Sequence, residues 1–140
     1  MTDIERIAHI LSDGRWHSSE ELADSVCIDY RSRLTEMRRR GARIEARKMP
    51  RKRHDGRTRY SNDWRDLDAL DALRQEIREQ VEAYRVTVPT NRTRVSIETR
   101  AGRVMVLGGR LRLLTPDAMT DEIMHALGCD STDRVTGVRT

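Results

Sequence analysis

The chain has 140 residues, of which 36% are apolar and 36% charged, and its formal net charge is +4. This length suits one domain, or two small domains with a thin core each. No apolar run approaches the roughly 18 residues that a membrane-spanning helix needs. The amino terminus lacks a signal-peptide pattern, so we expect a cytoplasmic protein without membrane contacts in which Cys27 and Cys129 are reduced thiols.

Three short helices are predicted within residues 3–41. Residues 3–13 carry apolar side chains at helical spacing and stop at Gly14. Ser18 or Ser19 can cap a second helix, with glutamates placed for a capping box. A third helix follows Asp29, and its apolar positions fall on one buried seam.

A two-stranded hairpin is predicted after the third helix. Residues 42–49 alternate well enough for a strand, residues 50–56 indicate a loop, and residues 57–61 form the return strand with Tyr60 pointing inward. Three helices and a hairpin make a unit of about sixty residues, a size that can fold alone.

A long amphipathic helix is predicted over residues 63–84, capped by Asn62 or Asp63. Such an apolar stripe needs a partner, which is either a second copy of the helix or the rest of the same chain. The stripe consists of Trp64, Leu67, Leu70, Leu73, Ile77, Val81 and Tyr84. We expect its members Leu67, Leu70, Leu73, Ile77 and Val81 to form a dimer or partner interface.

A small α+β segment is predicted over residues 85–128, formed by a β-meander and one helix. Gly108 and Gly109 indicate a tight turn between strands, and Pro116 suits the first position of the helix. The three expected strands cover residues 93–99, 103–107 and 111–114. Residues 129–140 are polar and are predicted to form a flexible tail.

The charge of the chain is concentrated in one block. Residues 31–59 hold thirteen Arg or Lys against three acids, a local charge of +10, so the remainder sums to −6. A basic block on a weakly charged body is typical of a surface that binds a polyanion.

Residues 5–61 resemble the winged helix-turn-helix domain of small phage and prophage proteins. The motif is Cys27-Ile28, Arg33-Leu34, the run 36–41 (EMRRRG), then Ile44 and a hairpin ending in Arg59-Tyr60. The segment GRWHSSEELA is also similar to the N-terminal domain of biotin-ligase repressors. The resemblance covers under half of the chain, and it implies double-stranded DNA binding through the third helix and the hairpin, or wing.

The resemblance assigns roles to the basic residues. Arg31, Ser32 and Thr35 lie on the outer face of the third helix, where they can reach base edges, and the later cations suit phosphate contacts. The full predicted DNA-binding set is Arg31, Ser32, Arg33, Thr35, Arg38, Arg39, Arg40, Arg47, Lys48, Arg51, Lys52, Arg53, His54, Arg57 and Arg59.

The predicted architecture is therefore an α+β chain with a winged helix over residues 1–62, a linking helix over 63–84, a small domain over 85–128 and a tail. We expect a phage or prophage transcriptional regulator in the host cytoplasm. The alternatives are an architectural factor for recombination and a phage adaptor or inhibitor that binds a host protein, with residues 63–128 available for a phage or host partner. RNA binding is disfavoured, because no exposed aromatic pair on a sheet is evident.

Enzyme and metal signals are weak. His125 and Cys129 have a spacing that can hold a metal, but the sequence offers no further ligands nearby. Asp68 and Asp71 share a helix face and could serve as ligands of a metal-dependent nuclease, yet they also suit the first turns of a helix and its solvent side. We expect no cofactor, no metal and no catalytic activity.

Overall fold

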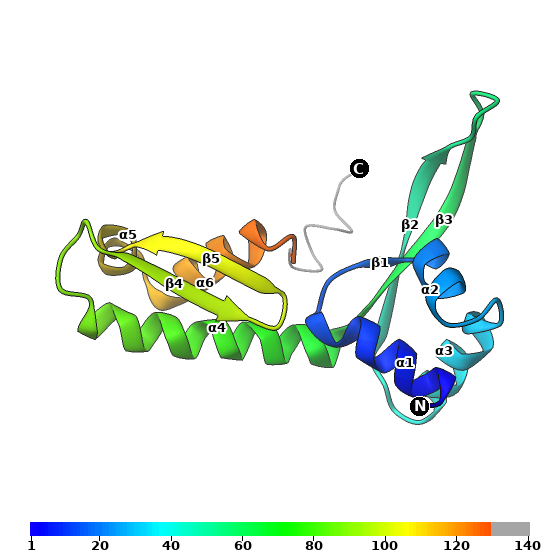
Figure 1. Cartoon of the computed structure of the whole chain (residues 1–140), viewed down its shortest axis with the longest axis horizontal. Helices are drawn as coiled ribbons and strands as arrows, with labels where there is room; N and C mark the ends of the chain where they lie inside the picture. Colours follow the sequence, from blue (N-terminus) through cyan, green and yellow to red (C-terminus); the bar gives the residue numbers. More distant parts are fainter. Residues whose placement is uncertain (130–140) are drawn as a thin grey trace.

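The computed structural model describes residues 1–129 as an elongated α+β molecule with two units at opposite ends (Figure 1). The N-terminal unit contains α1 (Asp3–Ile10), the 3₁₀ turn η1 (Leu11–Asp13), β1 (His17–Ser18), α2 (Ser19–Ser25), α3 (Tyr30–Arg39), β2 (Ile44–Lys52) and β3 (Thr58–Asp66). The C-terminal unit contains α4 (Leu67–Thr87), β4 (Arg94–Thr99), β5 (Gly102–Leu107), α5 (Gly108–Leu113) and α6 (Pro116–Ala126). The predicted α+β class is confirmed.

The three predicted N-terminal helices are present, and the first two are capped by side chains, whereas Asp29 at the start of α3 makes no side-chain cap bond. Thr2 caps α1 through a reciprocal capping box with Glu5. The Ser18 side chain accepts a hydrogen bond from the backbone N–H of Glu21 at the start of α2. The helices and the base of the sheet enclose one apolar core, formed by Ile7, Leu11, Leu22, Tyr30, Leu34, Met37, Ile44 and Trp64.

Gly14 allows the two units to pack closely against each other. It has a left-handed backbone with φ 78°, which favours glycine. A Cβ atom at this position would lie 3.1 Å from the Cα of Leu70 in the first turn of α4. The absence of a side chain therefore lets the end of η1 approach α4.

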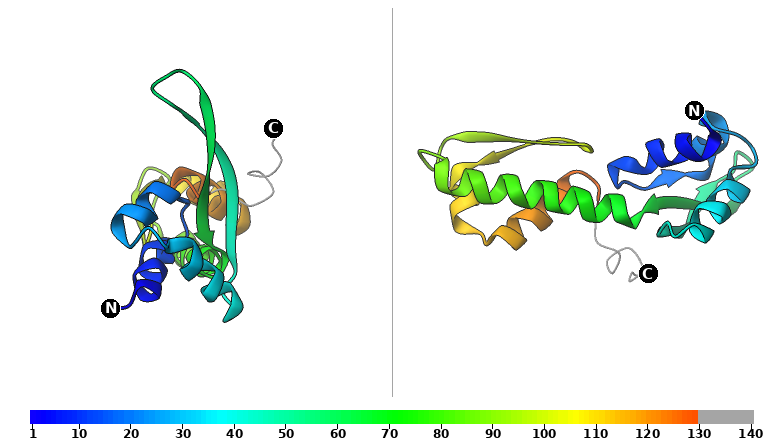
Figure 2. Two further views of the ribbon diagram at one scale, coloured as in Figure 1. Left: turned by 90° about the vertical axis from the view of Figure 1, so that its right-hand side faces the viewer. Right: turned by 90° about the horizontal axis from the view of Figure 1, so that it is seen from below.

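The N-terminal sheet is antiparallel, with strand order β1-β3-β2. Its hairpin rises well away from the helices (Figure 2). The hairpin is also longer than predicted, because Pro50 pairs with Tyr60 and only residues 53–57 lie outside the strands. The predicted loop over residues 50–56 and the inward position of Tyr60 are wrong, since Tyr60 is 64% exposed on a part of the hairpin that no core reaches.

The predicted start of the long helix is also wrong. Trp64 lies in β3, opposite Ala46 of β2 and His17 of β1, and α4 begins only at Leu67. Asp66 is the N-cap, and its carboxylate accepts bonds from the first backbone N–H groups of α4. Pairing on both sides of β3 outweighs the local capping signals at residues 62 and 63, so the first unit ends at residue 66 rather than 62.

The apolar stripe of α4 is covered by its own chain, which corrects the predicted dimer interface. Leu73, Ile77 and Val81 are completely buried, Leu70 is 8% exposed, and Leu67 packs against the same cluster. The hairpin β4–β5 lies along one side of α4, and the helices α5 and α6 lie along its other side (Figure 2). The alternative left open by the sequence, docking on the same chain, is the one found.

The C-terminal sheet has two strands instead of the predicted three. Residues 108–113 form α5, so the expected strand over 111–114 and the tight turn at Gly108-Gly109 are wrong. A Cβ on Gly108 would lie 2.3 Å from the carbonyl oxygen of Thr90, so glycine allows this helix start to approach the preceding loop. The spacing of Leu107, Leu111 and Leu114 is helical, and Leu111 is fully buried.

The last helix follows the prediction, with Thr115 as N-cap and Pro116 in the first turn. Cys129 is buried, and its N–H bonds the carbonyl of Met124, so the predicted tail does not begin there. The remainder of that tail, residues 130–140, lies outside the described residues. Among residues 1–129, no helix combines the length and the apolar character needed to cross a membrane.

Candidate nucleic-acid interface

The outer face of α3 presents the three side chains predicted to meet bases. Arg31, Ser32 and Thr35 are exposed, whereas Tyr30 and Leu34 face the core. The three outer side chains make only local bonds: Ser32 donates to the carboxylate of Asp29 (2.8 Å), and Thr35 donates to the carbonyl of Arg31 (3.0 Å). Such exposed, short-range bonds are readily exchanged for bonds to a ligand.

The remaining arginines in or next to α3 differ in how firmly they are bonded within the chain. Arg38 donates two hydrogen bonds to the carbonyl of Ile44, at 3.2 and 2.8 Å, and its guanidinium lies over the ring of Trp64. It therefore fastens α3 to β2, and its predicted role in holding a phosphate needs correction.

The other three arginines in or directly after α3 remain at the surface. Arg33 lies 3.8 Å from Asp3, and Arg40 pairs with Glu36. Arg39 is exposed and has no acidic partner among residues 1–129. Exposed ion pairs contribute little to stability and are screened by salt. These cations can therefore exchange their pairs for a polyanion at a small cost in free energy.

The base of the hairpin is held by a stack of rings and charges that the sequence did not reveal. The guanidinium groups of Arg47 and Arg65 both lie over the Trp16 ring, with their Cζ atoms 4.4 and 4.3 Å from the ring centroid. Arg65 is completely buried and donates to Glu45 at 2.8 Å. Cation–π contacts of desolvated groups contribute on the order of 2 kcal/mol each. Trp16 thereby fixes the root of the hairpin.

Asp63 extends this stack toward the tip. Its side chain is 9% exposed and accepts bonds from Arg47 at 3.2 Å and from Arg51 at 2.6 Å. Arg47 and Arg51 were predicted to bind DNA, but both are half-buried and neutralised by this carboxylate. The register that pairs residue 47 with residue 63 brings these groups together, and no local sequence pattern signals it.

The outer half of the hairpin carries cations without such restraint. Lys48, Lys52, His54 and Arg57 are exposed and, within residues 1–129, have no acidic partner. Arg53 and Arg59 have only surface contacts, each at 3.4 Å, with Asp55 and Glu20. An open hollow of about 810 Å³ lies between α2 and the tip, lined by Glu20, Arg51, Lys52, Arg53, His54 and Arg59.

His17 links three elements of the N-terminal unit. Its Nε2 lies 2.9 Å from Asp13, and its Nδ1 lies 2.9 Å from Glu21. Burial alone would lower the pKa of His17, but hydrogen bonds and charge from the two carboxylates outweigh burial and raise it. The protonated ring is the form that can donate to both acids at once.

Charges in the C-terminal unit are balanced, and most of its acids are paired. Residues 67–129 hold nine Arg and nine acids. Asp68 and Asp71, considered for a nuclease, both accept from Arg43, at 2.9 and 3.0 Å. Four further ion pairs join elements of this unit: Arg74–Asp121, Arg78–Asp117, Arg100–Glu76 and Arg110–Glu122.

No cluster of three metal-binding side chains occurs in residues 1–129. Cys129, whose spacing from His125 could hold a metal, is fully buried, and burial raises the pKa of its thiol. A raised pKa disfavours the thiolate, which is the form that binds metals and attacks substrates.

Comparison of the chain with protein-family models, with curated proteins and with solved structures finds no match.

Proposed function

We propose that residues 1–66 form a winged helix that binds double-stranded DNA. The observation that carries the proposal is a set of exposed cations on α3 and on the outer hairpin that have no acidic partner among residues 1–129, whereas Arg47, Arg51 and Arg65 of the same unit are paired. The set consists of Arg31, Arg39, Lys48, Lys52 and Arg57. Unpaired exposed cations gain most from phosphate contacts, because binding releases counterions from the nucleic acid.

The two basic elements have different tasks in this proposal. The outer face of α3 enters the major groove, where Arg31 can bond guanine and Ser32 or Thr35 can bond several bases. The hairpin tip, with Lys52 and Arg57, lies along the phosphates or in the adjacent minor groove. Arg38, Arg47 and Arg51 act indirectly, because their bonds hold the hairpin and α3 in a fixed relation.

The proposed biological role is transcriptional regulation in a phage or prophage, following the resemblance of residues 5–61 to winged helix-turn-helix proteins of that origin. Such a role needs site-specific binding, and the exposed polar face of α3 supplies groups that read bases.

Selection from a random-sequence duplex library tests the proposal. The wild-type chain is incubated with the library at near-physiological salt, and the bound fraction is sequenced. We expect a short recovered motif, which the variant Arg31→Ala relaxes at one or two positions, whereas Lys52→Ala lowers binding to all sequences alike.

Two results separate the alternatives. Binding without any motif would indicate an architectural factor, and it would contradict a site-specific regulator. Absence of binding to any duplex, by a chain whose circular dichroism shows it folded, would overturn the proposal in favour of a protein-binding adaptor.

A further inference from the structure

One edge of the C-terminal sheet is hydrogen-bonded by α4, whereas the other has no neighbouring strand among residues 1–129. The outer edge of β4 is occupied by α4, because the Gln80 side chain donates to the carbonyl of Glu98 at 2.7 Å and accepts from its N–H at 3.2 Å. In the two-stranded sheet β4–β5, β5 has no strand on its other side within residues 1–129. A free edge exposes backbone donors and acceptors to any other strand.

The register shows which groups face outward from β5. Glu98 turns its backbone groups to Gln80, so its cross-strand partner Arg103 turns its own groups away from β4. Backbone groups alternate in direction along a strand. Arg103, Met105 and Leu107 therefore present the outward-facing backbone groups of β5.

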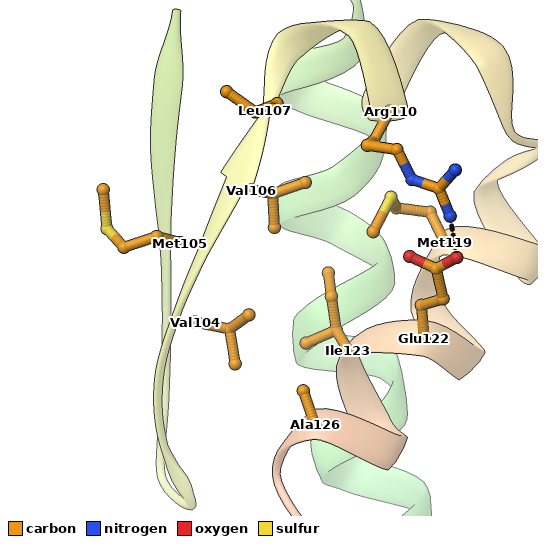
Figure 3. Close-up of a pocket in the computed structure, with 9 residues that line it drawn as sticks. All are labelled: Val104, Met105, Val106, Leu107, Arg110, Met119, Glu122, Ile123 and Ala126. Atoms are coloured by element: carbon orange, nitrogen blue, oxygen red, sulfur yellow. Dashed lines mark hydrogen bonds and ion pairs between the residues drawn. The ribbon is translucent and has the colours of Figure 1, made fainter.

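A groove lies beside this edge. Val104 and Val106 point toward α6, whereas Met105 and Leu107 point away from it (Figure 3). The groove has a volume of about 330 Å³, its floor includes Met119 and Ile123, and an ion pair between Arg110 and Glu122 lies at one end. β4 packs on α4, but β5 contacts chiefly β4 and α5, so α6 does not seal this side.

We propose that the free edge of β5 pairs with the same edge of a second copy, antiparallel and centred on Met105. A two-fold axis there places Met105 opposite Met105 of the second copy, and Arg103 opposite Leu107 of that copy. All three are positions with outward-facing backbone groups, so the register forms hydrogen bonds in both directions. The result is a four-stranded sheet with order β4-β5-β5-β4.

The side chains and charges of the strand favour a copy of itself as the partner. Met105 and Leu107 are 54% and 46% exposed, and pairing brings these apolar side chains together. The register keeps the two Arg103 side chains apart, whereas centring on Arg103 would place them face to face. The C-terminal unit has balanced charge, and the basic α3 and hairpin lie at the far end of the molecule (Figure 1), so pairing does not bring basic surfaces together.

Disulfide trapping tests the register on the full chain. Met105→Cys is made in a Cys27→Ser background and mildly oxidised. Residues that exchange hydrogen bonds across an antiparallel pair have Cα atoms about 5.5 Å apart, within the range of a disulfide. We expect a covalent dimer, and we expect none from Val86→Cys, a matched control at an exposed valine of α4. Equal trapping at both positions, or none at position 105, would overturn the register.

Sedimentation of the unmodified chain tests the association itself. We expect the wild type to reach dimer mass as its concentration rises. Met105→Arg should sediment as a monomer, because it places like charges face to face on the axis, while Val86→Arg should remain dimeric. A wild type that stays monomeric up to its solubility limit, or a dimer that Met105→Arg does not affect, would contradict the proposal. Neither experiment includes DNA, so their outcome is independent of the proposed DNA binding.

Discussion

The two units of this molecule differ in the charge that surrounds their arginines. In the C-terminal unit nine arginines are matched in number by nine acids, and several ion pairs tie α4 to α6 or to the β4–β5 turn. In the N-terminal unit Arg38, Arg47 and Arg51 are bonded to neighbouring elements, whereas most other cations of α3 and the outer hairpin have weak surface contacts or no acidic partner among residues 1–129. The comparison teaches that a high arginine content does not itself indicate a binding surface. What distinguishes the N-terminal surface is a local excess of exposed cations over acids, since Arg92 and Arg94 of the C-terminal unit are also exposed and have no acidic partner among residues 1–129.

The units also have separate apolar cores. One core surrounds Leu34 and Trp64, and the other surrounds Ile77 and Leu111. The two units meet where Gly14 approaches Leu70 and where Arg43 pairs with Asp68 and Asp71. We therefore expect each unit to respond to its own core substitutions.

The largest expected effect comes from Ile77→Ala in the C-terminal core. Ile77 is completely buried, so the substitution should lower the free energy of unfolding of that unit by about 2–5 kcal/mol. Both tryptophans, Trp16 and Trp64, lie in the N-terminal unit. Denaturant unfolding followed by circular dichroism should show a shifted component, while tryptophan fluorescence should change little. If both signals shift together by the same amount, the units unfold as one body.

A smaller loss is expected from Asp63→Asn at the root of the hairpin. The amide keeps the shape but cannot neutralise Arg47 and Arg51, so we expect a cost of about 1–3 kcal/mol in unfolding followed by tryptophan fluorescence. The control is Glu20→Gln, which removes only a surface contact with Arg59 and should cost less than about 1 kcal/mol. Equal effects of the two substitutions would show that the buried carboxylate does not hold the hairpin.

The smallest expected effect is a pH dependence centred on His17. Its pKa is raised in the folded state, so protonated His17 stabilises the fold fully below its unfolded pKa of about 6.5. This stabilisation is lost as the pH rises above about 6.5 and through the raised pKa. Thermal unfolding followed by tryptophan fluorescence should show the decline in the wild type and in the control His9→Gln, but not in His17→Gln. A decline that persists in His17→Gln would assign it to another group.

Local sequence signals predicted the three N-terminal helices, the hairpin and α6, because caps and apolar spacing act within a few residues of one another. They failed where long-range pairing decides. Residues 62–66 carry good helix caps, yet pairing with β1 and β2 makes them strand. The covering of Leu73, Ile77 and Val81 by later elements was only one of two alternatives that the sequence allowed.

The basic surface could be located from charge alone, but whether each cation is bonded within the chain could not. Arg38 and Arg39 are adjacent residues of the same type, but Arg38 is hydrogen-bonded to Ile44 in the fold and Arg39 is exposed. Trp16, Asp63 and Arg65 escaped notice because their partners are distant along the chain and meet only through the sheet.

The most direct test of the proposed DNA binding is its salt dependence, measured for two double variants with the same change in charge. The first is Lys52→Ala with Arg57→Ala on the outer hairpin, and the second is Arg92→Ala with Arg94→Ala, two exposed arginines of the C-terminal unit. Fluorescence anisotropy gives the slope of log affinity against log salt. Loss of two phosphate contacts should make the slope shallower by about 1.8 in the first variant, with the second matching the wild type. Equal slopes in all three proteins, or no binding by the wild type, would contradict the account.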